Sequence, residues 1–250
     1  MTEIPEAAAS GFATAADAYE RGRPGYPEKA IAWMAERLDL REGRDVLDLA
    51  AGTGKLTRTL VPFGARVIAV EPIDEMREQL FRALPDVDAF HGTAESIPLP
   101  DESVDAVTCG QAFHWFRAEE ALKEMHRVLR PGGGLALVWN VRDLADPLQK
   151  RVHEILEPHG RGINTHRGLD PRKAIEGSEL FGPVEHRSWP YVQRLSRAHL
   201  VDRVASISYI AILDPDSRAE VLSQVLAAAE GLPEPISIPY TTDIYIAIRS

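Results

Sequence analysis

Asp48-Leu-Ala-Ala-Gly-Thr-Gly54 is the stretch that decides the expected fold. A short apolar run that begins at Asp45 leads into it, and a helical pattern over 55–63 follows it. Glycine has no Cβ, so the backbone at Gly52 and Gly54 can turn sharply and approach a ligand closely. The helix after such a turn offers free N–H groups to an anionic group. The stretch therefore predicts a strand, a glycine turn and a helix that together cradle a ligand.

Strand and helix patterns alternate on both sides of this stretch. Apolar runs predict strands at 45–50, 66–71, 87–91, 103–109, 135–141, 189–195 and 236–248. Helical spacing marks 28–38, 55–63, 73–84, 118–129, 197–206 and 218–229, and 131–134 reads as a turn. Strands that alternate with helices form parallel sheets with right-handed crossovers. We expect an α/β fold: a doubly wound, mostly parallel, seven-stranded Rossmann-like sheet with an antiparallel edge strand and a small cap.

The length of 250 residues suits a single domain over 1–250. Residues 1–30 are expected to form an N-terminal cap segment, with a loose leader over 1–16 and a structured turn over 19–27. Residues 142–182 show scattered charge, His, Gly and Pro without a clean period, which suggests an inserted cap.

Composition limits the partners and the compartment. The net charge is −10, from 28 basic and 38 acidic residues, and an acidic surface repels nucleic acid. No apolar run reaches the roughly 18 residues of a membrane helix. Cys109 is the single cysteine, so no intrachain disulfide can form. We expect a cytoplasmic protein without nucleic-acid, membrane or metal partners, either a monomer or a homodimer.

The glycine turn by itself leaves several ligand classes open. A mononucleotide P-loop needs Ser or Thr after its lysine, but Leu56 follows Lys55. A dinucleotide fingerprint has a third glycine where Thr57 stands. A bare strand-turn-helix without a ligand also fits a lone glycine pair. Glu71, at the end of the next strand, can accept two hydrogen bonds from a ribose diol.

Four ordered segments extend the pattern and carry a resemblance. The stretch 48–54 resembles the first motif of class I S-adenosylmethionine-dependent methyltransferases. The matching segments that follow are Val70-Glu71-Pro72 with Met76, Gly92–Pro98 followed by Val104–Val107, and Glu124–Gly133. The resemblance covers about 17–141. Two further segments, Tyr19–Pro27 and Gln111–Phe116, resemble the branch of small-molecule enzymes that includes trans-aconitate methyltransferase.

The resemblance implies in-line transfer of a methyl group from S-adenosylmethionine to a small molecule, with S-adenosylhomocysteine as product. The expected cofactor contacts are Asp48, Ala50, Gly52, Gly54, Glu71, Pro72, Met76, Thr93, Ala94, Glu95, Gln111, Tyr19 and Arg23. Thr93 departs from the pattern, since many relatives carry Asp there. His114 is the candidate general base, because histidine titrates near neutrality. His114, Trp115, Trp139 and Asn140 are the expected substrate contacts.

Other functions fit parts of the pattern. A protein that binds S-adenosylmethionine but no longer methylates would keep the cofactor segments. A nicotinamide-dependent oxidoreductase conflicts with Thr57. A protein or RNA acceptor also fits, because the cap expected at 142–182 leaves a protein acceptor open, although the charge disfavours RNA. The sequence specifies neither the acceptor nor its methylated atom.

Overall fold

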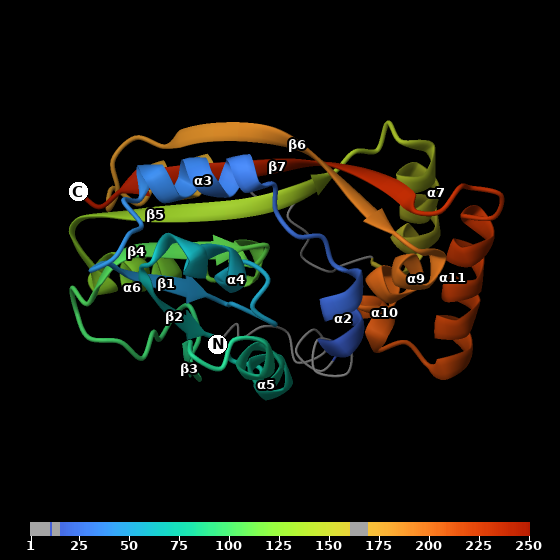
Figure 1. Cartoon of the computed structure of the whole chain (residues 1–250), viewed down its shortest axis with the longest axis horizontal. Coiled ribbons are helices and arrows are strands. Elements are labelled where there is room, and N and C mark those ends of the chain that lie inside the picture. Colours follow the sequence, from blue (N-terminus) through green and yellow to red (C-terminus); the bar gives the residue numbers. More distant parts are fainter. Residues whose placement is uncertain (1–10, 12–15, 161–169) are drawn as a thin grey trace.

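A computed structural model describes residues 11, 16–160 and 170–250 (Figure 1). In these residues a seven-stranded sheet runs in the order β3-β2-β1-β4-β5-β7-β6. The strands are β1 (Asp45–Leu49), β2 (Arg66–Val70), β3 (Asp88–Phe90), β4 (Val104–Gly110), β5 (Leu129–Arg142), β6 (Glu185–Leu195) and β7 (Ile236–Ile248). The first five pair in parallel, and β7 is antiparallel to both β5 and β6. This confirms the predicted α/β sheet, and the antiparallel pair of β6 and β7 forms one edge of it with β6 outermost.

Helices cover both faces of the sheet, as a doubly wound fold requires. The helices are α2 (Ala16–Gly22), α3 (Glu28–Arg37), α4 (Thr57–Leu60), α5 (Asp74–Ala83), α6 (Ala118–Val128), α7 (Pro147–Leu156), α8 (Pro171–Glu176), α9 (Arg197–Ala205), α10 (Ser208–Ala211) and α11 (Pro215–Ala228). Short 3-10 turns lie at Val61–Phe63, Phe113–Trp115 and Glu157–His159.

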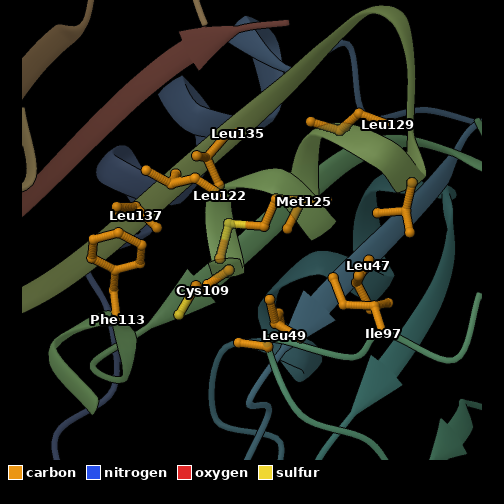
Figure 2. Packing of buried hydrophobic residues seen from close by; sticks show 14 of the residues in the cluster. Leu47, Leu49, Ile97, Cys109, Phe113, Leu122, Met125, Leu129, Leu135 and Leu137 are labelled. Atoms are coloured by element: carbon orange, nitrogen blue, oxygen red, sulfur yellow. The ribbon is translucent and has the colours of Figure 1, made fainter. Parts of the chain in front are cut away.

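The apolar core divides into two layers because successive strand residues point to opposite faces. On one face α6 and α8 pack on the sheet, and Figure 2 shows Leu122 and Met125 of α6 against Leu47, Leu135 and Leu137. On the other face α3, α4 and α5 pack against the alternate residues of the same strands. The two buried layers hold the carboxyl ends of the parallel strands in fixed positions.

A separate helical group lies at the carboxyl end of β5. Helices α7, α9, α10 and α11 share a third apolar cluster with the ends of β6 and β7 (Figure 1). Of the cap expected at 142–182, α7 belongs to this group, whereas Ile175 of α8 packs on the sheet with α6. Residues 161–169 lie outside the described residues, as does most of the leader expected at 1–16. No described helix is both long enough and apolar enough to cross a bilayer.

Two local predictions are wrong. The turn expected at 19–27 begins as helix, because α2 extends to Gly22 and docks on α9. The turn expected at 131–134 belongs to β5. There the register against β4 shifts between Val104 and Ala106, and Gly132 takes a φ of 75°. Residues 130–133 have no strand partner on β4 or β7, so a wide bulge interrupts the ladder within the bounds of β5.

Candidate functional site

The loop after β1 has an unusual backbone. Ala50, Gly52 and Gly54 all have positive φ, at 54°, 58° and 83°. A Cβ on Gly52 would lie 3.6 Å from the Sδ atom of Met76, and one on Gly54 would lie 3.1 Å from Leu80. The loop therefore turns back over the start of α5 at the carboxyl end of the sheet, where open α/β sheets place their ligands.

Glu71 joins this loop to the end of β2. Its Oε2 accepts a hydrogen bond from the Gly52 N–H at 2.9 Å, and its Oε1 accepts one from the Ile73 N–H at 3.0 Å. Burial raises the pKa of this carboxyl to about 7, although the two backbone N–H groups and Arg77 favour the charged form. A carboxylate oxygen has two lone pairs, so each oxygen can accept a further hydrogen bond. Glu71 thus holds the loop and keeps acceptor capacity for a ligand.

Asp48 is fully buried in β1, two residues before the loop begins at Ala50. The Thr57 hydroxyl donates to its Oδ2 at 2.6 Å, and the Thr108 hydroxyl donates to its Oδ1 at 3.2 Å. Burial raises the pKa of Asp48 to about 6, against the effect of these hydroxyls. The carboxyl group therefore ties β1 to the helix α4 and to β4.

We expect Thr57→Val to lower the free energy of unfolding by about 1–2 kcal/mol, because buried Asp48 loses one of its two hydroxyl donors. The measurement is urea denaturation. Thr59→Val is the matched control, since the Thr59 hydroxyl donates only to the Leu56 carbonyl. Equal losses in the two variants would show that Thr57 does not support Asp48.

Helix α2 covers the loop. Tyr19 packs with Ala16, Ile73 and Met76 in a small apolar cluster, and Figure 1 shows α2 between α5 and α9. Burial raises the pKa of the Tyr19 hydroxyl, and the nearby Glu71 charge adds to this rise. The structure therefore brings Tyr19, Met76 and Glu71 together. Their contacts with a cofactor stay predictions.

Sequence reasoning missed Glu20, which fastens α2 to the loop. Its side chain accepts from the Thr53 hydroxyl and from Arg58, both at 2.7 Å. Its backbone carbonyl accepts from Lys55 Nζ at 2.7 Å. One signal was available: the stretch 49–70 contains Lys55 and Arg58 but no acidic residue, so any carboxylate partner of theirs lies outside it.

Arg23 is directed toward α9 and not toward the glycine loop. Its Nε donates to the Ser206 hydroxyl and its Nη2 to the Ser206 carbonyl, both at 3.0 Å. Its guanidinium lies 5.0 Å from the centre of the Tyr19 ring. Arg23 therefore connects the covering helix to the helical group.

The segment after β3 lies partly in the core. Ala94 is buried there, and Thr93 is half-buried in an isolated bridge with Ser96. Glu95 accepts a hydrogen bond from the Arg117 N–H at 2.8 Å, which engages one carboxylate oxygen at the start of α6. Pro72 is half-buried directly after Glu71. Cofactor contacts from these residues stay predictions.

The turn after β4 faces the same edge of the sheet. Gln111 has a φ of 62°, and its N–H donates to the Val138 carbonyl at 2.8 Å. Within the described part of the chain, its buried Nε2 has no hydrogen-bond partner. His114 and Trp115 follow in the short 3-10 turn, half-buried, with ring centres 4.8 Å apart.

The two residues predicted at the end of β5 have structural contacts. Trp139 is buried, with its ring edge-to-face against Phe113 and Tyr245. Asn140 donates from Nδ2 to the Gly25 carbonyl at 2.8 Å and accepts from the Thr242 hydroxyl at 2.6 Å. Their roles as substrate contacts stay predictions.

No group of three or more His, Cys, Asp or Glu side chains gathers as a metal site among residues 11, 16–160 and 170–250.

Comparison with known proteins gives the family. A profile described as a methyltransferase domain matches residues 47–137, which run from β1 into β5. An uncharacterized methyltransferase of Mycobacterium tuberculosis is 42% identical over 240 residues, which cover 92% of each chain. The chain belongs to the methyltransferase family. A methyltransferase-like protein of Schizosaccharomyces pombe is 35% identical over 223 residues. That match covers 89% of this methyltransferase and 87% of the yeast protein.

Solved structures share the fold of this methyltransferase. The YcgJ protein of Bacillus subtilis matches with a TM-score of 0.61 at 20% identity, over 89% of this chain and 99% of its own. A Haemonchus contortus phosphoethanolamine N-methyltransferase, solved with phosphomonomethylethanolamine and S-adenosylhomocysteine, matches with a TM-score of 0.57 at 13% identity. That match covers 95% of this chain and 57% of the other.

Proposed function

We propose that this methyltransferase takes its methyl group from S-adenosylmethionine and transfers it to a small-molecule acceptor. The observation that carries the proposal is the buried Glu71 carboxylate, held against the glycine loop by Gly52 and Ile73. Two cis hydroxyls of a ribose are the ligand that suits such a carboxylate, because each hydroxyl can donate to one oxygen.

The surrounding residues fit the rest of the donor. Ile73, Met76 and Tyr19 form an apolar surface for the adenine. The unpartnered Nε2 of Gln111 offers a hydrogen-bond donor at the same edge of the sheet. When bound, S-adenosylmethionine supplies an activated methyl group on a positively charged sulfur.

The protein then acts mainly by position. Correct alignment of two reactants can supply about 7–11 kcal/mol of the barrier. The Tyr19 cluster and the Glu20 contacts hold α2 over the loop, which keeps water from the donor site. His114, at the carboxyl end of β4, is the group proposed to accept a proton where the acceptor is a hydroxyl or an amine.

A small-molecule acceptor suits the covered loop. A protein segment or an RNA strand would have to displace α2, which is fastened to α4 by Glu20 and to α9 by an ion pair between Arg21 and Asp202. The resemblance of 19–27 and 111–116 to trans-aconitate methyltransferase-like enzymes supports the same choice, as does the acidic net charge.

Calorimetry with S-adenosylhomocysteine and a transfer assay with radiolabelled donor test the proposal. We expect one binding site for the product, and label transferred to at least one small molecule in a broad acceptor panel. Absence of binding by well-folded protein would refute the donor assignment. Binding without transfer to any small molecule would favour a protein that no longer methylates.

We expect affinity for S-adenosylhomocysteine to rise about tenfold from pH 6 to pH 8. The ribose hydroxyls donate to ionised Glu71, whose pKa is about 7 in the free protein, so binding improves as the carboxyl loses its proton. Calorimetry across this range, in buffers of different ionisation enthalpy, would show proton release near pH 6. The Glu71→Gln variant should lose this dependence.

The stability of the free protein should change with pH in the opposite direction. The folded pKa of Glu71 lies above its ordinary value of 4.5, so its contribution to stability is complete below pH 4.5 and is lost as the pH rises through about 7. Asp48, raised from 3.8 to about 6, acts in the same sense. A free-protein Tm that rises from pH 5 to pH 8 would contradict this assignment.

A further inference from the structure

Three arginines lie together where the carboxyl end of β5 meets α9. Arg142 is the last residue of β5 and pairs across the sheet with Tyr240. Arg203 of α9 donates from Nε to the Tyr240 hydroxyl at 2.5 Å, and its guanidinium lies 5.5 Å from the centre of that ring. Arg23 binds Ser206, one turn further along the chain from Arg203. We call these residues the arginine cluster.

The positive charge of the arginine cluster has no counterion in the described residues. None of its three members forms an ion pair there, whereas Arg44, Arg127 and Arg130 each pair with two carboxylates. Burial, together with repulsion from Arg203 and Arg23, lowers the pKa of Arg142 to about 10. Buried charges are normally paired, because removing an unpaired charge from water is costly.

One atom of the cluster lacks even a neutral partner. The Nη1 of Arg142 is buried, and no described residue accepts a hydrogen bond from it. Guanidinium donors bind carboxylate and phosphate groups well, because their planar fork can bind two oxygens at once. An oxyanion would therefore satisfy both features: it would accept a hydrogen bond from Arg142 Nη1 and would neutralise the positive charge of the arginine cluster.

The arginine cluster is next to the donor site. Arg23 stacks over Tyr19, and Tyr19 packs on Met76 beside the glycine loop. Arg142 follows Asn140, which holds the Gly25 carbonyl of the same N-terminal segment. A molecule bound to the cluster would thus lie beyond the covered loop, on the side of the helical group.

We propose that Arg142, supported by Arg203 and Arg23, binds a carboxylate or phosphate group of the methyl acceptor, so that the acceptor is an anionic small molecule. This inference rests on the proposed function, since it requires a donor bound at the glycine loop. The competing occupant is the carboxylate of the donor itself, and the test separates the two.

In the experiment, matched acidic and neutral compounds are titrated into the protein that is already bound to S-adenosylhomocysteine. The pairs are benzoate and benzamide, glutarate and glutaramide, and phenyl phosphate and phenol. We expect at least one oxyanion to bind and its neutral partner not to bind. Arg142→Met should weaken that binding at least about tenfold, with affinity for S-adenosylhomocysteine unchanged. Arg142→Lys, which keeps the charge but not the fork, should lose less. Comparing the affinities of the two carboxylates with that of phenyl phosphate shows which oxyanion the site prefers.

Arg187→Met is the control, because it removes the same charge at a different place. Arg187 is exposed on β6, where its guanidinium lies over the Trp33 ring. It should leave oxyanion binding intact. The inference is overturned, while the proposed function stands, if no oxyanion binds the complex. The same holds if Arg142→Met weakens the binding of S-adenosylhomocysteine instead of oxyanion binding. If S-adenosylhomocysteine does not bind the unaltered protein, the proposed function itself has failed.

Discussion

Glu71→Gln is expected to weaken S-adenosylhomocysteine binding about 100-fold at pH 8, where the native carboxyl is ionised. Hydrogen bonds to a charged acceptor contribute about 1.5–3 kcal/mol each. The glutamine oxygen can still accept from one ribose hydroxyl, but the other hydroxyl loses its acceptor, a loss that corresponds to about 100-fold in affinity. The amide also turns an N–H group toward either Gly52 or Ile73, whose N–H groups now donate to the carboxylate. The substitution therefore removes a hydrogen bond that supports the glycine loop as well as one that would hold the ligand.

Calorimetry measures this effect, and Asp105→Asn is its control. Asp105 is also a buried carboxylate that accepts a backbone N–H, that of Asp45 at 2.8 Å, but it lies at the amino end of the strands. Asp105→Asn should lower stability and leave affinity unchanged. If Glu71→Gln bound as tightly as the unaltered protein, the cradle would not hold a ribose through this residue.

Gly22→Ala is expected to lower the free energy of unfolding by about 2–3 kcal/mol, the range of an overpacked contact. A Cβ on Gly22 would lie 2.2 Å from the backbone N of Arg203, and backbone cannot move aside as a side-chain tip can. Helix propensity alone predicts the opposite sign, since alanine is the better helix former by about 1 kcal/mol. The same change should weaken S-adenosylhomocysteine binding, because α2 carries Tyr19 and Glu20.

Urea denaturation and hydrogen exchange of the 16–22 amides test this prediction. Gly25→Ala is the control, since its Cβ would meet only the Tyr191 hydroxyl at an ordinary 3.7 Å. It should change stability by less than about 0.5 kcal/mol. Increased stability of Gly22→Ala, or unchanged exchange in α2, would show that α2 and α9 do not pack as closely as described.

Much of the sheet could be read from sequence because it depends on local patterns. Apolar runs such as 66–70 become strands, and the spacing of Leu122 and Met125 places them on the buried side of α6. The sharp turn at the glycine loop could also be predicted, since Gly52 and Gly54 do adopt positive φ. The turn at 19–27 was misread because packing of α2 on α9 outweighs Gly and Pro content. The glycines at 132–134 were read as a turn between elements, whereas they lie at a bulge inside β5.

The sequence by itself determined the α/β sheet and placed the glycine loop and Glu71 at neighbouring strand ends, because strand period and turn chemistry act over a few residues. Only the tertiary structure decided that Glu20 fastens α2 over the loop and that Arg23, Arg142 and Arg203 share one buried region. These residues lie more than 30 positions from their partners. Contacts of that kind arise from the packing of whole elements, which no local pattern specifies.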